Sequence, residues 1–291
     1  MPFPFITLQY GERQRLRELS KPVEVYDLQL AVGNALNGLL PLQPAKNVFK
    51  VGIEEDNASA VDVYENDYDA THTVLTTDVV LIVERISITD LSYVMANTVS
   101  NMIYLKKTRK LSTVTNGLTV DILRLFGQHL TDLTLDGPLH DVKLYDILAI
   151  FTKLRCLIIE NPYHGWVHDL LNADARNIKL LFYGEDNCFE NIFSFIPADL
   201  LQLLNKNCKI SVTCQNPCNE TFQTQVERIS AYLGPIFTIN TTSVSLPFFM
   251  VELHYLANPD TPEASSRMLL TQFVSRALLE AQGLGNTSIQ S

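Results

Sequence analysis

The chain has 291 residues, of which 46% are hydrophobic and 19% are charged. This composition can bury one large core or two moderate ones, and it excludes a disordered polymer. The net charge of −10 argues against a nucleic-acid partner, because phosphate binding needs a clustered basic face.

The first 40 residues predict three short helices. The second helix begins at a proline whose φ is preset for a first turn, and the third is a turn or short helix before Pro41. The apolar positions of the first two helices are Leu16, Leu19, Val25, Leu28 and Val32. Helices this short bury little by themselves, so they need a partner surface in this chain or in another.

The next segment predicts strands and one helix. Residues 48–69 read as two short strands around a polar turn at 56–59. Residues 77–90 predict a further strand, and residues 91–103 predict a helix after it. This strand and helix would form an early, degenerate copy of the pattern that follows.

Two stretches repeat one helix-then-strand pattern: DILRLFGQHLTDLTLDG at 121–137 and DILAIFTKLRCLIIEN at 146–161. Their apolar strand positions lie 24 residues apart, a third strand follows at the same step, and a fourth follows at a step of 29. The apolar positions of the four strands are Leu130, Leu133 and Leu135; Leu154, Leu157 and Ile159; Ile178, Leu181 and Tyr183; Ile210 and Val212.

This period lies in the range of leucine-rich repeats. Stacked units of this kind form a parallel sheet on one side and helices on the other, so residues between the buried positions face outward and bind another macromolecule. Ordinary alternating α/β units in a globular domain are the alternative interpretation. The predicted substrate-binding face consists of Asp132, Thr134, Asp136, Ile158, Glu160, Phe182, Ser211 and Thr213.

The end of the chain predicts a helix and strand after residue 221, a strand near residues 245–256, and a closing helix over 261–283. Thr261 and Pro262 fit the start of the closing helix and Gly283 fits its end. Its apolar stripe would be Leu270, Phe273, Val274, Ala277, Leu278 and Ala281. We expect this helix to cap the open core of the last repeat.

Residues 3–40, FPFITLQYGERQRLRELSKPVEVYDLQLAVGNALNGLL, resemble a divergent F-box of the type expanded in nematodes. The matching features are the Phe3–Pro4–Phe5 start, Leu8, the Leu16 and Leu19 pair, and Pro22 followed by Glu24 and Leu28. The resemblance implies that this segment packs against the Skp adaptor of a cullin-based ubiquitin ligase, while a C-terminal leucine-rich or F-box-associated domain captures a protein substrate. The implied adaptor-binding residues are Pro4, Leu8, Leu16, Leu19, Pro22, Val25, Leu28 and Val32.

The expected fold is α/β, with a three-helix F-box-like segment at 1–45, an irregular leucine-rich-repeat-like solenoid at 46–285 and a tail at 286–291. The expected function is a non-enzymatic substrate-recognition subunit of an SCF-type ubiquitin ligase. The alternative is a repeat-based protein-binding scaffold that has no link to ubiquitination and whose N-terminal helices only cap the repeats.

The sequence offers little chemistry for an enzyme. His164 and His168 lie one helical turn apart, which could seat a metal ion of a hydrolase, but Gly165 stands where a zinc hydrolase needs glutamate. Trp166 reads as core packing, and Cys208 as a core residue. The five cysteines and the absence of a secretory signal or a bilayer-length apolar stretch predict reduced thiols, a cytoplasmic or nuclear location and no membrane partner. We expect no metal and no cofactor.

Overall fold

The computed structural model separates the chain into two compact units, Met1–Thr131 and Asp132–Ser291. This division differs from the predicted boundary at residue 45, because the N-terminal helices group with the first strands. The structure describes residues 7–53, 60–64, 70–74, 79–89, 92–114, 117–137, 139, 141–160, 162–184, 189–215, 222–234, 236–240, 248–255 and 267–275.

The first unit contains a mixed sheet with strand order β5-β4-β1-β2-β3. Strands β5, β4 and β1 are parallel, while β2 and β3 add antiparallel pairs. The strands are β1 (Ala45–Ile53), β2 (Ala60–Tyr64), β3 (Ala70–Val74), β4 (Val80–Thr89) and β5 (Lys110–Val114). The helices are α1 (Tyr10–Leu19), α2 (Pro22–Val32), α3 (Tyr93–Met102), the short 3-10 helix η3 (Leu105–Lys107) and α4 (Val120–Leu125).

The strands and helix predicted between residues 48 and 103 are confirmed as β1, β2, β4 and α3. The Ser92 hydroxyl accepts a hydrogen bond from the Met95 amide at 3.2 Å and so caps α3. Of the two alternatives predicted for the third N-terminal element, the turn is correct and the short helix is wrong. Residues 33–42 form turns instead, because Gly33 and Gly38 have φ values of +57° and +83°, which a right-handed helix cannot contain.

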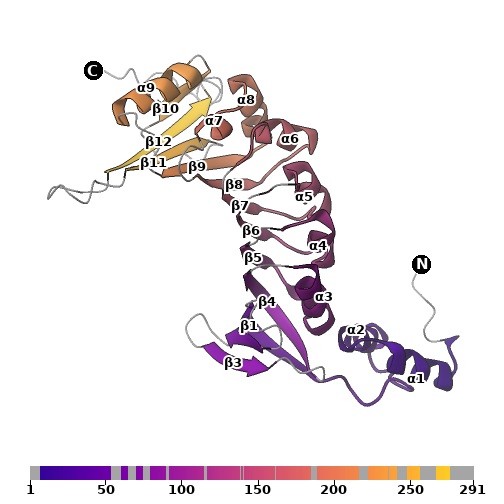
Figure 1. Cartoon of the computed structure of the whole chain (residues 1–291). Helices are drawn as coiled ribbons and strands as arrows, with labels where there is room; N and C mark the ends of the chain where they lie inside the picture. Colours follow the sequence, from indigo (N-terminus) through magenta and orange to yellow (C-terminus); the bar gives the residue numbers. More distant parts are fainter. Residues whose placement is uncertain are drawn as a thin grey trace. The chain divides into compact units, whose positions relative to one another are not determined.

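The second unit contains a sheet with strand order β10-β12-β11-β9-β8-β7-β6 (Figure 1). Strands β6 to β9 and β11 are parallel, and β12 runs antiparallel to both of its neighbours. The strands are β6 (Asp132–Asp136), β7 (Cys156–Glu160), β8 (Lys179–Gly184), β9 (Lys209–Gln215), β10 (Phe237–Asn240), β11 (Phe249–Tyr255) and β12 (Arg267–Ser275). The helices are α5 (Leu144–Ile150), α6 (Trp166–Asn172), α7 (Phe189–Ile192), α8 (Pro197–Asn205) and α9 (Phe222–Leu233).

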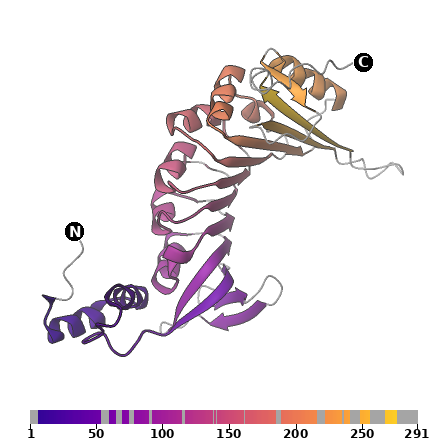
Figure 2. The same ribbon diagram turned by 180° about the vertical axis from the view of Figure 1, so that it is seen from behind.

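Helices α5, α6 and α8 stand on the same side of β6 to β9 in both views (Figure 1 and Figure 2). Each helix connects two adjacent parallel strands, and such crossovers share one hand, so successive helices fall on one face of the sheet. The opposite side of these strands, called the open face below, carries none of these three helices. The mixed α/β class predicted from the sequence is therefore confirmed.

The predicted pairing of β6 with β7 is correct residue by residue. Leu133 pairs with Leu157 and Leu135 pairs with Ile159, and all four side chains are only 1% exposed. These leucine and isoleucine side chains supply the apolar layer on which the helices pack, and each fully buried one contributes roughly 1.5–3 kcal/mol.

The predicted alternation in β8 is wrong by one residue. Leu180 and Phe182 are buried at 0% and 1% exposure, whereas Tyr183 is 42% exposed. The cause is the register: Cys156 pairs with Lys179, a step of 23 residues where the prediction used 24. A one-residue slip moves every side chain of a strand to the other face.

Two helices of the second unit end in the same way. Asp174 after α6 and Asn207 after α8 adopt positive φ values of +52° and +61°. In each case the next amide reaches back to a leucine carbonyl of the last turn, Ala175 to Leu170 at 3.0 Å and Cys208 to Leu203 at 3.2 Å. These are Schellman ends, which stop the helix and turn the chain into the following strand.

Aromatic side chains fill the core on the helix side of the second unit. Trp166 is fully buried, its indole N–H donates to the Ile192 carbonyl at 2.9 Å, and its ring lies 4.6 Å from that of Phe182. Phe195 stacks edge-on against both Trp166 and Phe249. Core packing was the predicted role of Trp166, and it is confirmed.

The predicted closing helix is wrong over its described part. Residues 267–275 form β12, which pairs with β11 and β10. The apolar spacing of this segment fits a helix, but a short apolar run fits a strand as well. Pairing with the edge of β11 gives the segment backbone hydrogen bonds between strands, and this tertiary context overrides its helix propensity. Residues 261–266 and 276–283 lie outside the described residues.

Candidate protein-interaction surfaces

The N-terminal helical segment, residues 7–43, folds as one piece. The Arg13 guanidinium donates to the Asn37 carbonyl at 3.2 Å and Arg17 donates to the Pro41 carbonyl at 3.4 Å, which ties the turns to α1. The buried Gln29 amide donates to the Leu39 carbonyl at 2.8 Å and accepts from the Gln43 amide at 2.8 Å, which ties the turns to α2. These bonds satisfy backbone groups that the irregular chain would otherwise leave unpaired.

One side of α2 packs on the rest of the first unit. The Tyr26 ring stands edge-on to that of Tyr104 at 5.2 Å, and the Tyr104 hydroxyl donates to Asp27 at 3.0 Å. The Lys106 ammonium also pairs with Asp27. Burial, followed by the hydrogen bond to Asp27, raises the pKa of Tyr104 to about 12, so the hydroxyl stays protonated and keeps donating.

The other surfaces of the segment expose apolar side chains. Leu19 is 68% exposed and Leu30 is 52% exposed, and Tyr10, Leu40 and Leu42 are each exposed by more than half. A shallow groove of about 460 Å³ runs along α1 and is lined by Leu8, Gly11, Glu12, Arg15 and Leu16. No side chain of α1 is buried, so this helix lacks the apolar cover that normally stabilises a helix.

The predicted adaptor-binding residues differ in exposure, and Leu8 and Leu16 among them line the groove along α1. Leu19 is exposed, and Leu8, Leu16, Pro22, Leu28 and Val32 are half-buried. Val25 is an exception, because it is 4% exposed and so packs inside the chain. Pro4 lies outside the described residues.

The open face of the second unit carries most of the predicted substrate-binding residues. Asp132, Thr134, Asp136, Ile158 and Glu160 lie on it and are half-buried. Ser211 and Thr213 also point to this side, opposite the fully buried Ile210 and Val212, but they are only 4% and 8% exposed and offer little contact area.

Phe182 does not belong to the open face, because the one-residue shift in β8 turns it against Trp166. The shift brings Lys179, Leu181 and Tyr183 to this face instead. Lys209 lies there too, as do Met250 and Glu252 of β11, which pair with Ser211 and Thr213. Met250 and Glu252 could be predicted to lie on this face only from the pairing of β11 with β9, which are about 40 residues apart in sequence.

Carboxylates dominate one edge of the open face. A Glu160 oxygen accepts from the Gly137 amide at 2.8 Å, and a Glu252 oxygen accepts from the Thr213 hydroxyl at 3.4 Å. These bonds orient the carboxylates without neutralising them. Burial raises the pKa of Asp136, as expected for a carboxylate with less water around it.

The histidine pair shows no metal geometry. His164 and His168 are exposed, and no group of three or more histidine, cysteine or acidic side chains in the described part of the chain could hold a metal ion. Asp169 instead accepts a hydrogen bond from the Tyr163 hydroxyl at 2.5 Å, and that hydroxyl accepts from the Leu144 amide at 2.8 Å. Tyr163 and Asp169 therefore join α5 to α6.

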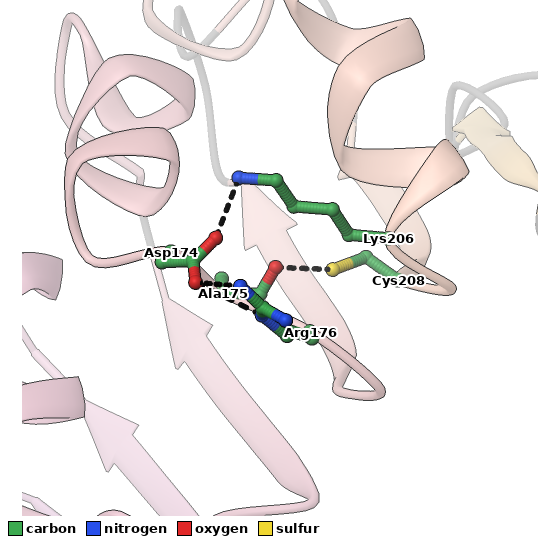
Figure 3. Close-up of polar contacts among 5 residues, drawn as sticks. All are labelled: Asp174, Ala175, Arg176, Lys206 and Cys208. Atoms are coloured by element: carbon green, nitrogen blue, oxygen red, sulfur yellow. Dashed lines mark hydrogen bonds and ion pairs between the residues drawn. The ribbon is translucent and has the colours of Figure 1, made fainter.

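A cluster at the turns before β8 and β9 is structural (Figure 3). Asp174 pairs with Lys206 at 2.9 Å and with Arg176, and these cations lower the pKa of its carboxyl. The Cys208 thiol is fully buried and lies 3.5 Å from the Ala175 carbonyl, as predicted for a core cysteine. Burial raises the pKa of this thiol, which keeps it protonated and unreactive.

Comparison with known proteins gives no relative: no family model, no curated protein and no solved structure matches the chain. Within the described residues, the structure has no helix that is long and apolar enough to cross a membrane.

Proposed function

We propose that the chain is a non-enzymatic substrate-recognition subunit of an SCF-type ubiquitin ligase. The observation that carries this proposal is the apolar area that the folded N-terminal helical segment presents to solvent through Leu19, Leu30 and their exposed neighbours. An exposed apolar patch of this kind marks a docking site for another protein. Its position coincides with the residues that resemble an F-box.

In this proposal the segment docks on the Skp adaptor, and the second unit holds a protein substrate on its open face. The parallel strands β6 to β9 with their one-sided helices support an irregular leucine-rich-repeat-like solenoid as the scaffold. The subunit itself performs no chemistry. It raises the effective concentration of a substrate lysine near the conjugating enzyme that the ligase recruits.

A second candidate function is a protein-binding scaffold that has no link to ubiquitination. The contact between α2 and the rest of the first unit favours it, since Tyr26 and Asp27 engage Tyr104 and Lys106 as a capping element would. The two functions differ in what the exposed side of α1 and α2 is for, and only the first requires a partner there.

The test is co-elution of the full chain with a purified Skp adaptor on size-exclusion chromatography. We expect a complex with the natural chain and none with the double variant Leu19→Asp, Leu30→Asp, whose two side chains already face solvent and whose change leaves the fold intact. Val94→Asp with Ile196→Asp is the matched control, since these residues are 74% and 65% exposed and lie outside the segment. Absence of a complex with the natural chain, or equal complexes with all three proteins, would overturn the proposal.

A further inference from the structure

Side chains on the open face form three rows that cross the strands. The strand register aligns them, since Ile158 pairs with Leu181, and Leu181 pairs with Ser211. The middle row is Thr134, Ile158, Leu181, Ser211 and Met250. The carboxylate row, two residues further along each strand, is Asp136, Glu160, Tyr183, Thr213 and Glu252, and the lysine row on the other side is Asp132, Cys156, Lys179 and Lys209.

The rows differ in chemistry. The middle row offers three half-buried apolar side chains, Ile158, Leu181 and Met250. The carboxylate row has three acids and no base, while the lysine row ends in two exposed lysines. The face is therefore apolar along its centre, negative along one side and positive at one end of the other side.

Two acids of the carboxylate row, Asp136 and Glu160, are available to the cations of a partner. Among the described residues, no ion pair involves Asp136 or Glu160, and the raised pKa of Asp136 reflects the loss of water around a carboxylate. Tyr183, which is 42% exposed, stands beside Glu160 in this row and offers a ring face as well. Carboxylates and a tyrosine ring together attract lysine and arginine side chains.

The dimensions of the face match one α-helix. The lysine and carboxylate rows lie four residues apart along each strand, which is about 13 Å at about 3.3 Å per residue. A helix with its side chains is about 10–12 Å wide, so its two flanks would meet the two outer rows. Five strands at about 4.8 Å spacing give a face about 19 Å long, which about 13 helical residues would cover.

We propose that the open face binds an amphipathic helix of a partner protein, with its apolar stripe on the middle row, a cationic flank along the carboxylate row and an anionic flank at Lys179 and Lys209. This inference rests on the open face being the substrate-recognition surface of the proposed function. The charge on both flanks fixes the direction in which the helix lies, because reversing it would place like charges together.

The test uses the full chain and fluorescein-labelled, side-chain-bridged helical peptides of about 13 residues. All peptides carry the same leucine stripe. One has a lysine flank and a glutamate flank, a second has glutamate on both flanks, and a third has the composition of the first with a central proline that breaks the helix. We expect fluorescence anisotropy to show binding of the first peptide at least about tenfold tighter than that of the other two.

Charge reversal in the protein supplies the second arm. Glu160→Lys should weaken binding of the lysine-flanked peptide by about tenfold and strengthen binding of the glutamate-flanked one. Glu190→Lys on α7 is the control: it breaks the ion pair of Glu190 with Arg228, but it lies on the helix side of the sheet and should change neither binding. Equal binding of the helical and the proline-broken peptide, no binding of any peptide, or equal effects of the two reversals would each overturn the inference. The adaptor co-elution is a separate measurement, so failure here with an intact adaptor complex removes only the helix-binding inference.

Discussion

The substitution Gly38→Ala adds one methyl group and tests how closely the turns of the N-terminal helical segment pack on α1. Its φ is +83°, and a Cβ at this residue would lie 2.8 Å from the Arg13 Cβ and 3.0 Å from the Tyr10 carbonyl oxygen. Both contacts are with backbone or with the root of a side chain, so α1 would have to shift as a whole. Gly38→Ala should therefore push the turn and α1 apart.

The loss of stability expected for Gly38→Ala has two parts. Positive φ costs an L-residue about 1–2 kcal/mol, and an overpacked methyl group adds about 1–3 kcal/mol. The sum of about 2–5 kcal/mol exceeds what a ten-residue helix without buried side chains gains from docking. We expect hydrogen–deuterium exchange to show α1 unprotected in Gly38→Ala and the second unit unchanged.

Two other glycines of the segment separate these contributions. Gly33 has φ +57° with no atom near its would-be Cβ, so Gly33→Ala carries conformational strain alone. Gly11 lies in α1 with open space around it, and Gly11→Ala should stabilise the helix by at most about 1 kcal/mol. Protection of α1 should fall in the order Gly11→Ala, natural chain, Gly33→Ala, Gly38→Ala. If Gly38→Ala and Gly33→Ala were equally protected, the close approach of the turn to α1 would be refuted.

Three further predictions concern the second unit. Phe182→Ala should lower the free energy of unfolding of the second unit by about 3–5 kcal/mol because the ring is buried on Trp166, whereas Tyr183→Ala should lower it little. Denaturant melts compare the two variants. A larger loss for Tyr183→Ala than for Phe182→Ala would favour the register predicted from the sequence. Asn207→Ala and Asn207→Gly both lose the hydrogen bond that the Asn207 side chain donates to Asn177, but only alanine adds a cost of about 1 kcal/mol at the positive φ. Thermal melts compare the two variants, and equal losses would refute the Schellman end. The folded protein binds the proton of the Asp136 carboxyl more tightly than the unfolded chain does. Ionisation of Asp136 therefore lowers the stability of the folded protein as the pH rises from the usual carboxyl pKa through the raised one. Asp136→Asn should thus raise the melting temperature at about pH 7 and leave it nearly unchanged below about pH 3.5, where Asp136 is protonated in both states; a variant no more stable at neutral pH would contradict this.

The fold was predictable where one apolar pattern had a single interpretation. Leu133 and Leu135 alternate with polar residues, so β6 and its pairing with β7 follow from the sequence. In β8 the run from Leu180 to Tyr183 is apolar at every position, and only the 23-residue step decides which side chains are buried. In β12 the apolar residues fit a helix and a strand equally well, and the neighbouring strands decide.

The interaction surfaces were predictable to a smaller extent. The resemblance at residues 3–40 indicated which helices would need a partner, but the burial of Val25 depends on how α2 packs within the first unit. On the open face, Asp136 and Glu160 followed from the repeat. Met250 and Glu252 did not, because β11 reaches its place beside β9 only after an intervening helix and a further strand.

Docking on the adaptor through α1 and α2 is the central claim, and hydrogen–deuterium exchange of the full chain with and without a purified Skp adaptor tests it most directly. We predict that the adaptor protects amides within residues 7–43 and leaves those of β6 to β9 unchanged. Protection on the open face with none in residues 7–43, or no protection at saturating adaptor, would contradict the claim.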